Sequence, residues 1–310
     1  MTLRDKFLLE LLEKAKKDDS IVLLSVDMGA PAIDSWKREL PNQYVEMGIS
    51  EQNAINVAAG LSRGGKKVFV YFMAVWVHRC FEQIRYSCAI AGNPITILGN
   101  GVGLGYAPAG PAHAPNEDIS VMKSLLNIEI YSPSTELQIS NLVEICLTNK
   151  KLNYVRLERK TNVDYQKDIS PYVSKKFDPF IFASTNTKHL EILVLSYGYI
   201  SSYVYKAFLS LDEKEREKIS FVDIQKIWPL DLEHLQKIIK QIKKIVFIEE
   251  QTANGSIFEF ICRYLIGNKI YVETASLHLP QKYIFDNGNQ DELLQKYGFS
   301  QSSIMNLLKV

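Results

Sequence analysis

The sequence has few cysteines, no long apolar run and almost no excess of charge of either sign. Thirty-six basic residues stand against 35 acidic ones, so the net charge is +1 and no overall field attracts nucleic acid or an anionic membrane surface. No run of roughly 18 consecutive apolar residues occurs, so no membrane-spanning helix is expected. The N-terminal MTLRDKFLLELLEKAKK alternates charges with leucines at helical spacing, which is not typical of a signal peptide.

The four cysteines show no CxxC spacing and fall within apolar helical patterns: Cys80, Cys88, Cys146 and Cys262. We therefore expect buried thiols in a reducing compartment, and the cytoplasm as the location of the protein. The histidines form no cluster with the spacing of metal ligands, so the sequence predicts no metal site built by this chain alone.

Short β-branched runs alternate with helical patterns along the chain. They occupy residues 21–26, 68–72, 95–98, 128–131 and 154–157, and then 191–198, 219–224, 245–250 and 270–273. This alternation predicts an α/β fold of two doubly wound domains with mainly parallel sheets. A polar, proline-containing stretch without sustained periodicity interrupts it. We therefore expect a first domain at 1–160, a linker at 161–188 and a smaller domain at 189–310.

A carboxylate opens a helix of small apolar residues in the stretch VEMGISEQNAINVAAG, residues 45–60. Ser50 can cap this helix, and Gly64 and Gly65 can end it. Apolar residues follow at the spacing of one buried stripe: Ala54, Val57, Ala58 and Leu61. Glu51 then lies in the first turn, where the helix dipole favours a carboxylate, so its position alone indicates no more than a helix-start acid.

Three motifs, in order along the chain, change that interpretation. GISEQNAINVAAGL, YFMAVWVHRCFEQIR and GPAHAPNEDISVMKSLLNIEIYSPS resemble the pyrimidine-binding domain of the transketolase family of thiamine diphosphate enzymes. VDIQKIWPLDLEHL and VFIEEQTANGS are similar to the carboxy-terminal domain of the same family. The resemblance covers nearly the whole chain. It extends to the carboxy-terminal two thirds of transketolase and deoxyxylulose phosphate synthase, and to the beta chain of pyruvate dehydrogenase type enzymes.

The resemblance implies cofactor-binding roles. Glu51 occupies the place of the family glutamate that hydrogen-bonds the ring nitrogen of the thiamine aminopyrimidine. This contact promotes the imino tautomer that removes the thiazolium C2 proton. Trp76 stands where the family has an aromatic residue, usually phenylalanine, that stacks on the pyrimidine. Phe72 and Met73 are either neighbours in the same apolar wall or plain strand core.

The resemblance also implies substrate contacts. His113 in GPAHAPNED matches the family histidine that faces the reacting end of the substrate, and His78 is a second candidate. Arg159 matches the arginine that contacts a substrate phosphate, which implies a sugar phosphate or nucleotide-linked sugar; a surface arginine at a strand end is the equal alternative. The acidic residue that transketolases commonly carry shortly before the histidine is replaced by Ala109. Either the sugar is bound differently, through Tyr106 for example, or the donor lacks that hydroxyl.

In this family a GDG motif holds the cofactor diphosphate through Mg²⁺. The sequence contains no GDG motif. The resemblance therefore implies a partner, an N-terminal transketolase subunit with the GDG motif. Thiamine diphosphate and Mg²⁺ would lie between the two chains, and this chain would form a homodimer within a heterotetramer.

The leading hypothesis is the small subunit of a split transketolase, which moves a two-carbon ketol unit from a ketose (phosphate) donor to an aldose acceptor. The altered loop before His113 resembles that of transketolase-like chains associated with specialised sugar biosynthesis. The alternatives are the beta subunit of a 2-oxoacid dehydrogenase type complex and a non-catalytic scaffold subunit.

Overall fold

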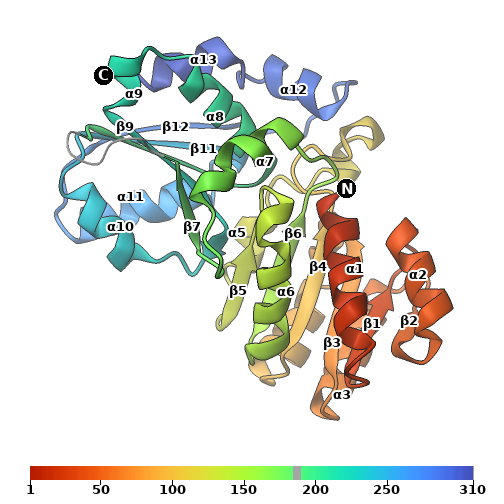
Figure 1. The fold of residues 1–310 in the computed structure, drawn as a ribbon. Coiled ribbons are helices and arrows are strands. Elements are labelled where there is room, and N and C mark those ends of the chain that lie inside the picture. Colours follow the sequence, from red (N-terminus) through yellow and green to blue (C-terminus); the bar gives the residue numbers. More distant parts are fainter. Residues whose placement is uncertain (184–189, 310) are drawn as a thin grey trace.

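A computed structural model describes residues 1–183 and 190–309, which form two sheets with helices packed on both faces (Figure 1). In this part of the chain the first sheet has seven strands in the order β10-β5-β6-β4-β3-β1-β2, and the second has five in the order β12-β11-β8-β9-β7. All neighbours pair in parallel except β10 with β5 and β7 with β9. The predicted α/β fold with two mainly parallel sheets is confirmed.

The first sheet consists of β1 (Ile21–Ser25), β2 (Tyr44–Glu46), β3 (Lys67–Met73), β4 (Ile95–Asn100), β5 (Ile128–Tyr131), β6 (Leu152–Leu157) and β10 (Lys226–Trp228). The second consists of β7 (Phe180–Ala183), β8 (Ile192–Ser196), β9 (Ile219–Ile224), β11 (Lys244–Thr252) and β12 (Glu273–Leu279). The central strands are buried along their whole length, because helices cover both faces.

The helices of the first domain are α1 (Leu3–Ala15), α2 (Pro31–Glu39), α3 (Glu51–Arg63), α4 (Phe81–Gln83), α5 (Asp118–Met122) and α6 (Ile139–Thr148). One face of its sheet packs against α1, α2 and α6, and the other against α3, α4 and α5. The helices that follow are α7 (Val163–Ile169), α8 (Ser201–Leu209), α9 (Glu213–Arg216), α10 (Leu232–Ile239), α11 (Ile257–Gly267), α12 (Gln290–Lys296) and α13 (Gln301–Leu307). In the second domain α10 and α11 cover one face of the sheet, and α7, α8, α12 and α13 the other.

One strand starts later than the sequence predicts, and part of the predicted linker has regular secondary structure. The sequence predicts a strand at 270–273, but β12 starts only at Glu273, whose N–H donates to the carbonyl of Lys243 at 3.0 Å; the preceding Ile270 and Val272 pack against the core instead. The segment 161–183 contains α7 and β7 and is therefore not an irregular linker throughout. The predicted boundary at 188/189 lies outside the described residues.

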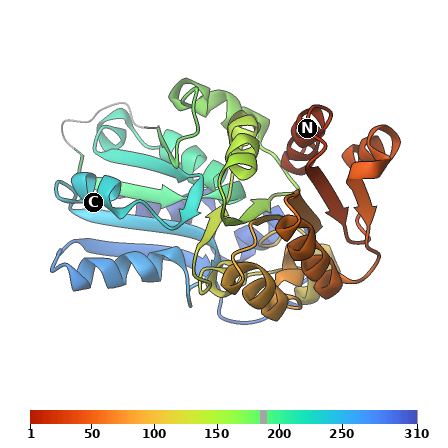
Figure 2. The same cartoon turned by 90° about the horizontal axis from the view of Figure 1, so that it is seen from below.

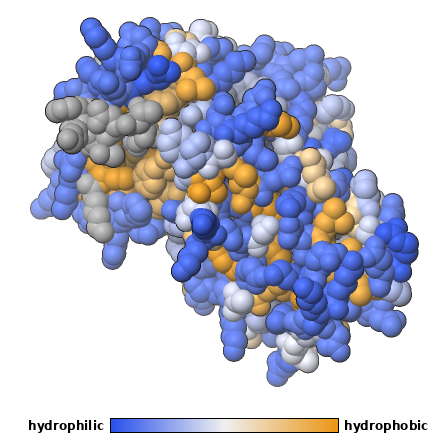
Figure 3. All heavy atoms as spheres, viewed as in Figure 1, coloured by the Kyte–Doolittle hydropathy of each residue, from blue (hydrophilic) through white to orange (hydrophobic). Residues whose placement is uncertain are grey.

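The two domains lie side by side (Figure 2), and one of the three apolar clusters of the described residues contains buried side chains from both domains. Strand β10 follows the second-domain strand β9 but pairs with β5, so the chain returns to extend the first sheet. The face in Figure 3 is mainly hydrophilic with scattered hydrophobic side chains. Within the described residues no helix has the length and apolar character needed to cross a membrane.

Candidate active site

Helix α3 begins at Glu51, whose side chain is buried although it carries a charge. Ser50 precedes the helix but does not cap it as predicted, because its hydroxyl donates to the carbonyl of Met47 at 2.7 Å. The end of the helix is as predicted, with Gly64 at the cap and Gly65 at a positive φ of 90°. The buried face consists of Ala54, Ile55, Ala58 and Ala59, whereas Val57 and Leu61 of the expected stripe are half-buried.

Glu51 forms an ion pair with a residue that sequence reasoning missed. Nη1 of Arg79 donates to Oε2 of Glu51 at 3.0 Å, and the Arg79 side chain keeps 45% of its surface exposed. The same guanidinium lies 4.2 Å from the centre of the Trp76 ring. Trp76 in turn meets His113 edge-on, with ring centres 5.9 Å apart. The structure thus brings together Glu51, Trp76 and His113, and the spacing of three residues between Trp76 and Arg79 was the available signal for Arg79.

Phe72 and Met73, the other two predicted cofactor contacts, lie at the end of β3. Phe72 is fully buried in the core between this strand and the α3 side of the sheet, so the structure places it in the strand core. Met73 is half-buried and immediately precedes the 3₁₀ turn Ala74–Val77, which carries Trp76. Met73 therefore remains adjacent to the Trp76 site.

Both candidate histidines carry a buried ring nitrogen without a hydrogen-bond partner in the described part of the chain. Nδ1 of His78 lies 2.9 Å from the carbonyl of Val75, which leaves Nε2 unpaired. In His113 the unpaired atom is Nδ1. Ten other buried side-chain atoms of the described residues also lack a partner, so the unpaired nitrogens alone do not identify a ligand site.

Tyr106 and Arg159 form a second group beside the first. The Arg159 guanidinium lies 4.2 Å from the centre of the Tyr106 ring and donates to the carbonyl of Gly105 at 3.3 Å. The Tyr106 hydroxyl accepts from Nδ2 of the buried Asn100 at 2.8 Å. Gly101 has a φ of +74°, and a Cβ there would lie 2.0 Å from the Tyr106 ring, so only glycine allows this packing. Arg159 remains exposed and free to meet an anion.

These residues gather beyond the carboxyl ends of the parallel strands β3, β4 and β6, where ligands of α/β sheets commonly bind. Among the described residues no group of three or more His, Cys, Asp or Glu side chains is arranged to hold a metal ion. The site of this chain therefore offers aromatic, imidazole, carboxylate and guanidinium groups.

The Arg79 guanidinium indicates what the Glu51–Trp76 pair accepts. It is a planar cation whose central carbon lies 4.2 Å from the centre of the Trp76 ring and whose Nη1 donates to Glu51. A thiamine aminopyrimidine with a protonated ring nitrogen has the same two features, a flat face and an N–H donor. The residues present fit that group.

Two family models together match most of the chain. Residues 1–163 match the transketolase pyrimidine binding domain, and residues 183–304 match the transketolase C-terminal domain. One subunit of the apulose-4-phosphate transketolase of Phocaeicola vulgatus is 30% identical over 304 residues, which cover 97% of this chain and 94% of that protein. A 1-deoxy-D-xylulose-5-phosphate synthase from Alkaliphilus oremlandii is 24% identical over 301 residues, but the match spans only 47% of its length.

The fold is shared with a solved structure described as a split gene transketolase, inactive β4 tetramer. It superposes with a TM-score of 0.84 at 23% identity, over 99% of this chain and 97% of that chain. The shared fold and the two family models agree. The chain belongs to the transketolase family and joins a pyrimidine-binding domain to a transketolase C-terminal domain.

Proposed function

We propose that this chain is the small subunit of a split transketolase, which transfers a two-carbon ketol unit from a ketose (phosphate) donor to an aldose acceptor. The observation that carries the proposal is the pairing of Glu51 and Trp76 around a planar cationic donor. The four free cysteines of the chain suit a reducing compartment, the cytoplasm.

Thiamine diphosphate, when bound, supplies an acidic thiazolium carbon for breaking and forming carbon–carbon bonds. The residues of this chain would hold and orient its aminopyrimidine. Glu51 would accept a hydrogen bond from the protonated ring nitrogen and Trp76 would stack on the ring, in place of the contacts that both residues make with Arg79. His113, whose ring meets Trp76 edge-on, and His78 are the candidates for hydrogen bonds to substrate oxygens.

The diphosphate and Mg²⁺ are held mainly by a partner chain with the GDG motif, because this sequence has no such motif. Large exposed apolar side chains just before α3 and on the turn packed against this helix support a docking surface for that partner. Ile49 is 76% exposed, and Tyr86 and Ile90 on the π-helical turn packed against α3 are 66% and 60% exposed. The relative from Phocaeicola vulgatus is itself named as one subunit of a transketolase, which supports a second subunit here, and we expect a homodimer of this chain within a heterotetramer.

The substrate is a sugar phosphate, with a nucleotide-linked sugar as the other source of the same phosphate chemistry. The exposed guanidinium of Arg159 beside Tyr106 supports an anion contact, and a relative named for apulose-4-phosphate agrees with a specialised sugar. Ala109 stands where an acid would bind a sugar hydroxyl, so Tyr106 takes over the contact to the sugar.

The test is ketol transfer by this chain mixed with the GDG-containing chain of a neighbouring gene. Transfer from a ketose phosphate to an aldose, in the presence of thiamine diphosphate and Mg²⁺, supports the proposal. Reduction of a lipoyl acceptor with a 2-oxoacid instead identifies a 2-oxoacid dehydrogenase subunit. A complex that binds no cofactor and transfers nothing identifies a scaffold.

A further inference from the structure

The carboxyl end of β11, in the second domain, contacts the loop that carries two of the substrate-binding candidates. Glu250, Gln251 and Thr252 are consecutive and buried. Their partners lie in the first domain, on both sides of the segment that contains Tyr106 and His113. These contacts are independent of the proposed function, and only their effect on substrate binding rests on it.

The first contact is at the start of the loop. Oε1 of Glu250 accepts from the backbone N–H of Leu104 at 2.6 Å, and the side chain is itself held by Nε2 of Gln290 on α12 at 3.0 and 3.1 Å. Gly103, beside Leu104, has a φ of +54°, and a Cβ there would lie 2.6 Å from Glu250 Oε1. The loop is therefore built to admit this carboxyl group.

The second contact is at the end of the loop. Nε2 of Gln251 donates to the carbonyl of Pro115 at 3.3 Å and to Oδ1 of Asp118 at 2.8 Å. The backbone N–H and the hydroxyl of Thr252 both donate to the carbonyl of Asn116, at 3.0 and 3.2 Å. Five hydrogen bonds from three consecutive residues thus reach residues on either side of the 105–114 segment.

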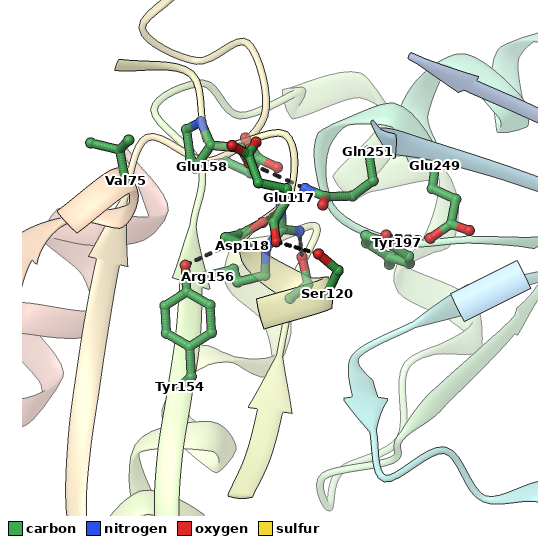
Figure 4. Close-up of polar contacts among 12 residues, drawn as sticks. Val75, Glu117, Asp118, Ser120, Tyr154, Arg156, Glu158, Tyr197, Glu249 and Gln251 are labelled. Atoms are coloured by element: carbon green, nitrogen blue, oxygen red, sulfur yellow. Dashed lines mark hydrogen bonds and ion pairs between the residues drawn. The ribbon is translucent and has the colours of Figure 1, made fainter. Parts of the chain in front are cut away.

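Asp118 makes the second contact rigid. Figure 4 shows Asp118 at the centre of a buried polar group with Arg156 and Gln251. Nε of Arg156 and the hydroxyl of Tyr154 donate to Oδ2 of Asp118 at 2.8 and 2.7 Å, and Oδ1 accepts from Nη2 of Arg156 at 3.3 Å and from Nε2 of Gln251 at 2.8 Å. Buried hydrogen bonds to a charged group are strong and directional, so they fix the loop end relative to β6.

We propose that Glu250, Gln251 and Thr252 are positioning residues with which the second domain holds both ends of the 104–116 loop and so places Tyr106 and His113. None of these hydrogen bonds involves the proposed cofactor residues Glu51 and Trp76, although the Trp76 ring meets His113 of the loop edge-on. Loosening this clamp, meaning the hydrogen bonds of Glu250, Gln251 and Thr252 to the loop ends, should therefore weaken substrate binding much more than cofactor binding.

The first experiment measures amide hydrogen exchange in the isolated chain, so it needs neither partner nor activity. Gln251→Met keeps the volume of the side chain but removes the amide donor, and Thr252→Val removes the hydroxyl. Each should raise exchange within residues 104–116 at least about fivefold, the equivalent of one lost hydrogen bond. The matched control is Gln241→Met, which alters an exposed glutamine just before β11. Loop exchange at the wild-type rate in both variants overturns the proposal.

The second experiment uses the complex with the partner chain. Gln251→Met should raise KM for the ketose donor about tenfold, with the Kd of thiamine diphosphate unchanged within about twofold. Equal losses of donor and cofactor binding would contradict a positioning role and indicate general destabilisation. If the wild-type complex transfers no ketol unit while the loop still loosens in the variants, the proposed function fails and the clamp stands.

Discussion

The carboxylate of Glu51 is buried at the start of α3, and the ion pair that the structure gives it is with the half-exposed Arg79. A helix-start acid that served only the dipole would lie at the surface, where water solvates its charge. Burial against Trp76 and Arg79 is therefore better explained by a ligand that needs an acceptor there.

Replacing Glu51 with Gln should lower ketol transfer at least about 100-fold, because the amide cannot accept and stabilise a shared proton as a carboxylate does. The fold should remain, since Gln has nearly the same volume and α3 keeps its apolar face. Activity and thermal unfolding of the variant complex test this expectation. Glu82→Gln, which alters an exposed acid on α4, is the matched control. Transfer near the wild-type rate in Glu51→Gln would contradict the role given to this residue.

Trp76 should tolerate Phe but not Ala. Phenylalanine preserves the flat face on which a pyrimidine stacks, so we expect cofactor affinity within about threefold of the wild type in Trp76→Phe. Trp76→Ala removes that face, and the Kd of thiamine diphosphate should rise about tenfold. Calorimetry on the complex measures both values. Equal affinities in the three proteins would show that Trp76 packs beside the site without touching the cofactor.

At the level of secondary-structure elements, the carboxyl ends of β6 and β11 bring together two buried carboxyl groups, one from each domain. Glu158 follows β6 and Glu250 lies in β11; burial and the nearby Glu250 carboxyl raise the pKa of Glu158, and burial raises the pKa of Glu250. Oε2 of Glu158 has no hydrogen-bond partner in the described chain, which agrees with a neutral, protonated group. The other charged or titratable groups that act on the pair are Arg156, Asp118, Asp291, Tyr199 and Tyr203.

Thermal stability should fall as the pH rises from about 5 to about 8. An unperturbed glutamate loses its proton near pH 4.5, so above that pH the folded state binds more protons than the unfolded state and the free energy of unfolding decreases. Glu158→Gln removes one of the two titrating carboxyl groups, so thermal stability should depend less on pH in this variant. Glu233→Gln, which alters an exposed glutamate, should leave the pH dependence unchanged. Thermal unfolding across this range is the measurement. An unchanged slope in Glu158→Gln would mean that this carboxyl is already ionised in the folded chain.

The buried central strands could be predicted from the sequence because strands covered on both faces consist of consecutive apolar residues. The strands that were missed or misplaced are β2, β7, β10 and β12, and each lies at the edge of its sheet. An edge strand needs fewer apolar residues, so ETASLHL and KIW carry a weak signal.

The candidate site was predicted in part. Motifs placed Glu51, Trp76 and His113, and the structure brings them together. The spacing from Trp76 was a signal for Arg79, but its ion pair with Glu51 and the clamp at Gln251 could not be predicted, because these contacts are set by tertiary packing between segments distant in sequence; Gln251 and Pro115, for example, are 136 residues apart.

At the level of the whole molecule, the shared core and the return of β10 to the first sheet make the two domains one unit. This unit contains a pyrimidine-binding domain and no GDG motif. We therefore propose that a second chain completes the site, and that it docks over the exposed Ile49, Tyr86 and Ile90, which lie just before α3 and on the turn packed against that helix.

The most direct measurement is calorimetric titration of thiamine diphosphate with Mg²⁺ into this chain alone, into the GDG-containing partner alone, and into the mixture. We predict tight binding only in the mixture, and its loss when the mixture contains Glu51→Ala. The matched control, Glu82→Ala, should bind like the wild type. Absence of binding in the wild-type mixture, or tight binding by the partner alone or by the Glu51→Ala mixture, would contradict a cofactor site shared between the two chains.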